Sequence, residues 1–236
     1  MLLGEIGQGV VQAARLLFSL DPGLYQIIGL SLAVSGGAVL TAALVAIPLG
    51  ALLALRPFPG SKALAVLADA LMGLPPVVVG LLVYLFFARS GPLGVLDLLY
   101  TPTAMMIAQF LLVLPIITAL VRAAVAARDR RVRETAQTLG ASPAQAALSV
   151  VVEARGALVG AVLAGFGRAL AEVGAVMLVG GNLEGRTRVM TTAIVLETGK
   201  GNFDTAIALG LVLILLAITV TALLRRFTSP WEEAGA

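Results

Sequence analysis

Five long apolar stretches separated by short polar segments dominate the sequence. They cover residues 24–55, 63–88, 104–127, 157–179 and 203–224. Each reaches the length of about 20 residues that a helix needs to cross the hydrocarbon core of a bilayer. The pattern therefore predicts an all-α, polytopic membrane protein with five transmembrane helices, and the first stretch is long enough to tilt or to project into water.

The first 20 residues differ from these stretches because polar side chains are spread among the apolar ones. Glu5, Gln8, Gln12 and Arg15 interrupt the run. This pattern favours a helix that lies in the membrane interface over a sixth span. A signal peptide is the alternative, but the segment lacks a basic start and a small-residue cleavage site. We expect an interfacial helix over 1–20, a transmembrane domain over 21–228 and a tail over 229–236.

Local signals mark helix starts and one interruption. Asp21, Thr101 and Ser61 each offer a capping side chain before a stretch. Pro75 and Pro76 remove backbone hydrogen bonds inside the second stretch, which lipid cannot replace. We expect a broken helix there, either as part of a substrate route or as a structural kink. Small residues continue along the fourth stretch, where they favour close helix packing: Gly156, Gly160, Gly165, Gly167 and Gly174.

The distribution of Lys and Arg between the stretches predicts the orientation. One set of loops holds ten cations (Arg56, Lys62, Arg122, Arg128, Arg130, Arg131, Arg133, Arg155, Arg225 and Arg226), whereas the opposite set holds five (Arg15, Arg89, Arg186, Arg188 and Lys200). The richer side is expected in the cytoplasm. With five spans, the N-terminus then lies outside and the C-terminus in the cytoplasm.

Composition excludes several kinds of chemistry. Hydrophobic residues make up 59% of the chain and charged residues 12%, and cysteine and histidine are absent. Disulfides, thiolate or histidine metal ligands and histidine-based catalysis are therefore excluded. The sequence also lacks the G-x-x-x-x-G-K-[ST] phosphate loop. We expect no catalytic residue, no metal site, no cofactor bound by this chain and no nucleic-acid partner.

A polar segment on the predicted cytoplasmic side interrupts the apolar pattern. "RETAQTLGASPAQAALSVVVEAR" covers residues 133–155. Gly140 suits the left-handed turn after a helix, Ser142 suits an N-cap, Pro143 the first helical position and Gln145 a capping box. The segment thus predicts two short helices with a tight elbow, which is either a surface for another protein or a solvated connector.

Polar residues inside the stretches are candidates for a pathway, but each also suits a contact with a neighbouring helix: Gln109, Thr118, Ser31, Ser35 and Thr41. Arg168 and Glu172 are four residues apart and can form an ion pair on one helix face. We favour a structural pair over a role of Arg168 in meeting an anion, because Glu172 would repel a dianion in a shared path.

The elbow resembles the EAA loop of ABC importer permeases, through Glu134, Ala136 and Gly140. "LRPFPGSK", "MGLPPVVVGLLVY", "RSGPLG", "GRALAEVGAVMLVGGN" and "TTAIVLET" are similar, in order and spacing, to molybdate/tungstate permeases, with the tungstate type nearest. The resemblance covers residue 24 to the C-terminus. One departure is "VVVEAR", where the general signature has an apolar "I-x-L-P", so the bend that this proline provides must come from Gly156 or be absent.

The resemblance implies a type I ABC importer permease with a MetI-like fold. Two copies would pair, two ATPase subunits would bind the cytoplasmic loop at about 128–155, and an extracytoplasmic binding protein would deliver the oxyanion. ATP and Mg would reside in the ATPase partner. The implied coupling residues are Glu134, Ala136, Leu139, Gly140, Ala141, Ser142 and Pro143, and the pathway candidates are Pro75, Pro76, Gln109 and Thr118.

Two other classes stay open from the residues alone. The chain could be a proton-coupled secondary transporter, for which Asp69 and Glu172 are the only intramembrane acids, or a non-catalytic subunit of another membrane complex. The sequence does not distinguish tungstate from molybdate, because both are tetrahedral dianions of similar size.

Overall fold

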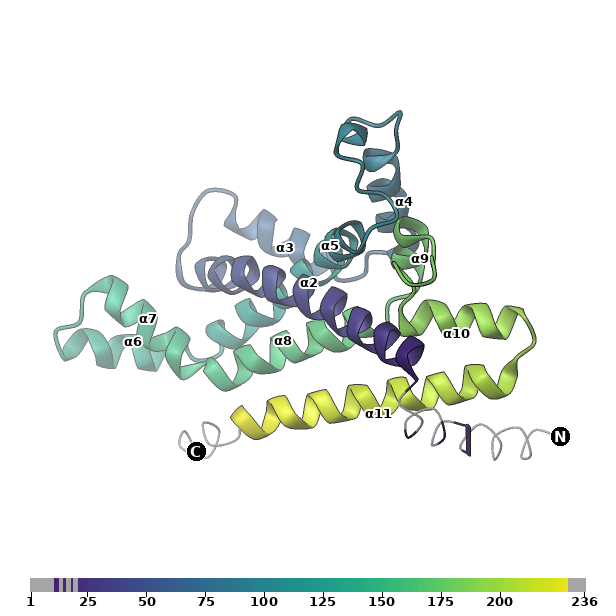
Figure 1. Cartoon of the computed structure of the whole chain (residues 1–236). Coiled ribbons are helices and arrows are strands. Elements are labelled where there is room, and N and C mark those ends of the chain that lie inside the picture. Colours follow the sequence, from purple (N-terminus) through teal and green to yellow (C-terminus); the bar gives the residue numbers. More distant parts are fainter. Residues whose placement is uncertain (1–10, 13–14, 16–17, 19–20, 229–236) are drawn as a thin grey trace. The chain divides into compact units, whose positions relative to one another are not determined.

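The computed structural model describes residues 11–12, 15, 18 and 21–228, without the side chains of 129–131 and 225–228. Throughout this part the regular elements are helices and none is a strand (Figure 1). The expected interfacial helix at 1–20 and the tail at 229–236 fall largely or wholly outside it and stay predictions. The helices are α2 Pro22–Leu55, α3 Ser61–Leu71, α4 Pro76–Phe87, η1 Gly94–Leu96, α5 Pro102–Ala126, α6 Asp129–Thr138, α7 Pro143–Glu153, α8 Arg155–Leu170, α9 Gly174–Gly180, α10 Met190–Gly199 and α11 Phe203–Thr228.

Among the described residues, three helices are long and apolar enough to cross a membrane, namely α2, α5 and α11. The number rises to five if two bent helix pairs each count as one span. The pair α3 and α4 is bent by 105° and the pair α7 and α8 by 60°. The chain is therefore a multi-pass membrane protein.

The predicted break at Pro75 and Pro76 is confirmed. α3 ends at Leu71, and α4 begins at Pro76, with Pro75 in the extended conformation before it. Pro76 occupies the first helical position, where its missing N–H has no intrahelical partner to lose. The two prolines thus end one helix and start another in a new direction.

The fourth stretch is not the single helix over 157–179 that its apolar run suggests. α8 ends at Leu170, and α9 begins only at Gly174. The bend between α7 and α8 also exists without the proline of the family signature, and it lies at Ala154 and not at Gly156. Both interruptions are stabilised by charged side chains, which a hydropathy pattern does not reveal.

Two of the three predicted caps are confirmed. Leu24 N–H donates to Asp21 Oδ1 at 2.8 Å, and Ala104 N–H donates to Thr101 Oγ1 at 3.4 Å. Ser61 is not a cap, because Gly60, at φ 90°, turns the chain so that the helix already begins at Ser61. The Ser61 hydroxyl instead accepts the Phe58 N–H.

Contacts divide the described part of the chain into two compact units, of which the first comprises residues 21–38, 75–109 and 167–221. Its core joins α2, α10 and α11 through Leu24, Met190, Ala193, Ala208, Leu209 and Val212. The Ser31 hydroxyl accepts the Met190 N–H at 2.8 Å and so fixes the start of α10 against α2. α4 packs closely on α9, where a Cβ at Gly80 would lie 2.7 Å from Ala175 Cα.

The second unit comprises, of the described residues, 39–74, 110–166 and 222–228. Gly50 of α2 lies against the Thr118 carbonyl of α5, and Gly165 of α8 lies against Ile117. The glycines of the fourth stretch therefore differ in role. A Cβ at Gly165 or Gly174 would meet a neighbour at 2.8 Å, whereas at Gly160 or Gly167 it would meet nothing within 4 Å.

The break between α8 and α9 is organised around Glu172, which is 3% exposed. Its Oε2 accepts from Arg168 Nη1 at 2.6 Å, and its Oε1 accepts the Ala175 N–H at 2.9 Å. Its backbone carbonyl accepts from Thr191 Oγ1 at 2.8 Å. One carboxylate thus caps the start of α9 and pairs with the last turn of α8, which satisfies polar groups that an interrupted helix leaves open.

Replacing Glu172 by Gln should destabilise the protein by about 1.5–3 kcal/mol, the range for hydrogen bonds to charged groups. Glutamine retains an acceptor for Ala175 but leaves Arg168 without its counter-charge. The double variant Arg168→Gln/Glu172→Gln should recover part of the loss. Thermal unfolding in detergent and membrane abundance measure both effects.

The matched control is Glu184→Gln, since Glu184 pairs with Arg188 at the same spacing of four residues but is 84% exposed. This change should alter stability by at most about 0.5 kcal/mol. A Glu172→Gln variant as stable as the Glu184→Gln control would contradict the structural role.

Candidate coupling hairpin and pathway residues

α6 and α7 form a helical hairpin (Figure 1), and backbone hydrogen bonds close its elbow. Gly140 has φ 89°, the left-handed conformation that residues with a Cβ rarely adopt. Gly140 N–H donates to the Gln137 carbonyl, and Ala141 N–H donates to the Ala136 carbonyl, both at 3.0 Å. This pair of bonds is a Schellman motif, so the predicted end of the first short helix is confirmed.

The second short helix begins with the predicted capping box. Ser142 Oγ accepts the Gln145 N–H at 3.3 Å, and Gln145 Oε1 accepts the Ser142 N–H at 2.8 Å. Pro143 occupies the first turn. The chain direction at the elbow is therefore fixed from both sides by local sequence.

The corner of the hairpin presents small side chains and one large apolar one. Leu139 is 84% exposed. Glu134, Ser142 and Pro143 are exposed as well, whereas Ala136 and Ala141 are half-buried. A large, exposed apolar side chain beside a glycine turn is suited to contact with another protein.

Two arginines of this segment bind helix C-termini. Arg128 Nη1 donates to the carbonyl of Glu153, the last residue of α7, and so closes the base of the hairpin at the bend into α8. Arg133 Nη1 donates at 3.2 Å to the carbonyl of Leu55, the last residue of α2. Both roles were missed from the sequence, where the arginines indicate only a cytoplasmic loop.

Gln109 and Thr118 are both buried and both hydrogen-bonded to helix carbonyls. Gln109 Nε2 donates at 2.9 Å to Ala169 near the end of α8, and its buried Oε1 has no protein partner. Thr118 donates to the Leu114 carbonyl of its own helix. Pro75 is exposed and Pro76 half-buried. The positions of these pathway candidates therefore also suit structural roles.

The remaining polar candidates of α2 differ in exposure. Ser31 and Ser35 are buried, at 4% and 3% exposure, whereas Thr41 is exposed. The Ser31 hydroxyl bridges the Ile27 carbonyl and the Met190 N–H. Its contact is thus between helices of the first unit, one of the two roles that the sequence left open.

Asp69 and Arg122 form an ion pair that was not predicted from the sequence. Arg122 Nη2 lies 3.0 and 2.8 Å from the two Asp69 oxygens, and it joins α3 to α5 across 53 residues of sequence. Opposite charges so far apart give no local signal. The pair anchors the first half of the broken α3 and α4 segment.

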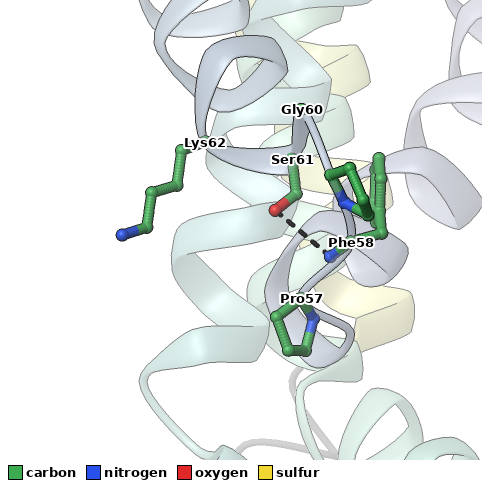
Figure 2. Close-up of a pocket in the computed structure, with 6 residues that line it drawn as sticks. Pro57, Phe58, Gly60, Ser61 and Lys62 are labelled. Carbon is green, nitrogen blue, oxygen red and sulfur yellow. Dashed lines mark hydrogen bonds between the residues drawn. The ribbon is translucent and has the colours of Figure 1, made fainter.

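A shallow hollow of about 380 Å³ lies at the loop between α2 and α3 (Figure 2). It is lined by Pro57, Phe58, Pro59, Gly60, Ser61 and Lys62. Figure 2 shows the Lys62 ammonium pointing away from the other lining residues. A wall formed by one loop with a single charged side chain does not gather groups for an anion, so we assign it no ligand.

Among the described residues, two groups outside the predicted spans have shifted pKa values, namely Glu197 near the end of α10 and Tyr100 before α5. The Asn202 amide at 2.7 Å, followed by the Lys200 ammonium at 2.8 Å, holds the pKa of Glu197 below its ordinary value. A hydrogen bond with Tyr84 raises the pKa of Tyr100. These contacts order the turn between α10 and α11 and the segment before α5, and they bring no nucleophile and base together.

Comparison with known proteins agrees with the transporter resemblance. The chain is 42% identical to the tungstate uptake system permease protein TupB of Peptoclostridium acidaminophilum, over 93% of this chain and 96% of that protein. It is 42% identical to a probable anion ABC transporter permease protein of Haloferax volcanii, over 86% and 90%. It is 36% identical to TupB of Campylobacter jejuni, over 92% and 91%. Residues 46–231 match the model of the binding-protein-dependent transport system inner membrane component, and the chain therefore belongs to this family of transport permeases.

Proposed function

We propose that this chain forms the membrane pathway of an ATP-driven importer for a tetrahedral oxyanion. Tungstate is the favoured substrate, and molybdate is the alternative. The observation that carries the proposal is the α6–α7 hairpin, whose rigid elbow presents Leu139 and Gly140 at an exposed corner. Such a corner is suited to a groove of a separate ATPase subunit. Tungstate is favoured because two of the relatives are named for its uptake.

The proposed assembly contains two copies of this chain, two ATP-binding subunits and an extracytoplasmic oxyanion-binding protein in the cytoplasmic membrane. The chain lacks a phosphate loop, so ATP and Mg belong to the partner subunit. The binding protein selects the oxyanion, since tungstate and molybdate share charge and shape. Glu134 to Pro143 of the hairpin then supply the contact with the ATPase.

We propose five spans with the N-terminus outside and the C-terminus in the cytoplasm. Support comes from the ten cations on the hairpin side against five on the other. α3 and α4 together form the second span. For the fourth span we propose α8 and α9, which cover the apolar stretch 157–179 and which the Glu172 contacts hold across their break; α7 then belongs to the hairpin and not to a span.

A proton-coupled carrier is disfavoured by the partners of the two intramembrane acids. Asp69 pairs with Arg122, and Glu172 pairs with Arg168. An acid engaged with arginine is a poor proton relay.

The pair of Arg168 and Glu172 also disfavours Arg168 as a contact for the transported anion. A guanidinium that a carboxylate already neutralises attracts a dianion only weakly. Uptake retained in a stable Glu172→Gln variant and lost in the double variant would instead assign Arg168 to the pathway.

Replacing Gly140 by Leu should uncouple transport or abolish association with the ATPase subunit while the permease still inserts. Leucine cannot adopt φ 89° without strain, and its side chain blocks close approach at the corner. The measurements are co-purification with the ATPase subunit and oxyanion uptake into proteoliposomes.

Gly140→Asn is the matched control, because asparagine tolerates the left-handed conformation better than other residues with a side chain. It should retain more association and uptake than Gly140→Leu. If the Leu variant assembles and transports normally, the hairpin is only a connector between spans.

The orientation is tested by cysteine labelling, for which the chain is suited because it has no native cysteine. A cysteine at Gln137, which is exposed on α6, should react only with reagent on the cytoplasmic side. One at Asn182, in the loop after α9, should react only from outside. Labelling of both positions from the same side would exclude the five-span arrangement.

A further inference from the structure

The carbonyl of Leu55 at the end of α2 lacks the donor that a continuing helix would supply. Four residues later stands Pro59, which has no N–H, and Pro57 likewise cannot donate. Leu55 is 7% exposed, so its carbonyl needs a protein partner. Arg133, in the middle of α6, is this partner: its Nη1 donates a hydrogen bond to the Leu55 carbonyl at 3.2 Å.

The α6–α7 hairpin that carries Arg133 is held at both ends. The Schellman motif and the capping box fix its elbow, and Arg128 bonds the last carbonyl of α7 at its base. From Arg133 to Gly140 is seven residues, or about 10 Å along a helix. A displacement of the elbow is therefore transmitted to Arg133 with little internal bending.

The chain joins the hairpin directly to α5 and α8, but not to α2. α6 follows α5 after a short turn, and α7 runs into α8 through the bend at Ala154. α2 is 78 residues away in sequence at the Leu55 contact. The Arg133 bond thus gives α2 a connection to the hairpin that the covalent chain does not provide.

We propose that Arg133 is a positioning residue that transmits movement of the α6–α7 hairpin to α2 through the Leu55 carbonyl. The inference rests on the proposed docking of the hairpin to an ATPase subunit. A cation at a helix C-terminus is favoured by the helix dipole and by the orphan carbonyl, so the bond persists while the hairpin moves. α2 then follows the hairpin together with α5 and α8.

The test compares Arg133→Gln, Arg133→Lys and Arg56→Gln in the complete complex reconstituted in proteoliposomes. Arg56 is the matched control because it is an exposed cation next to Leu55 in sequence. The quantities measured are co-purification of the ATPase subunit, ATP hydrolysis and tungstate uptake per ATP hydrolysed.

We expect Arg133→Gln to bind the ATPase subunit and hydrolyse ATP, with uptake per ATP reduced at least about fivefold, the lower range of coupling between sites. Arg133→Lys should fall between Gln and wild type, since the ammonium still donates to the carbonyl but lacks the guanidinium geometry. Arg56→Gln should match wild type. A merely structural cap would lower abundance and leave uptake per ATP unchanged.

Three results would overturn the inference: unchanged uptake per ATP in Arg133→Gln, an equal loss in Arg56→Gln, or loss of ATPase binding in Arg133→Gln, which would make Arg133 a docking residue. These outcomes leave the proposed function intact. A wild-type permease that does not bind the ATPase subunit would instead contradict the proposed function.

A second measurement covers the case in which Arg133→Gln does not insert. Spin labels on cysteines at Arg56 and Gln137, placed in one permease copy, report the distance between the end of α2 and the hairpin. With Arg133 present, we expect the same narrow distance distribution with and without ATP. A wild-type distance that changes with ATP would show that the two segments do not move together and would overturn the inference.

Discussion

The structure depends on how backbone polar groups are satisfied where its helices are interrupted. A bilayer offers no water to an unpaired N–H or carbonyl, so each interruption needs a partner from the protein. Glu172 supplies this at the break between α8 and α9, where it caps one helix and binds Arg168 of the other. A buried carboxylate is acceptable there because both of its oxygens accept hydrogen bonds, one from Arg168 and one from the Ala175 N–H.

The same requirement explains the polar residues of the first unit. Gln109 donates to Ala169 beside the break, Thr191 donates to the Glu172 carbonyl, and Ser31 accepts from Met190 at the start of α10. These side chains are buried because they complete the backbone of neighbouring helices. The burial of these polar side chains is therefore no evidence that they line a transport path. A side chain that contacts substrate has to be distinguished from one that only completes the hydrogen bonds of a helix.

In the second unit, arginines have the equivalent role at helix C-termini. Arg128 and Arg133 bind the last carbonyls of α7 and α2, and Arg122 holds Asp69 of α3. Positive charge in this unit thus has two consequences. The arginines favour the cytoplasmic side of the membrane for the loops that carry them. Arg128 and Arg133 also bond the α6–α7 hairpin to the ends of α7 and α2, so that this polar hairpin is fixed to the helices of its unit.

Features that depend on local chemistry could be predicted from the sequence. The helical class follows from apolar length, the break at Pro75 and Pro76 from missing amide donors, and the elbow from Gly140, Ser142 and Gln145, whose partners lie within five residues. The folded chain alone reveals the contacts of Gln109, Asp69 and Arg133, which join residues 60, 53 and 78 positions apart. It also divided the fourth stretch into α8 and α9. Hydropathy averages over neighbouring residues, whereas these contacts depend on which side chain lies beside an unpaired carbonyl or amide in space.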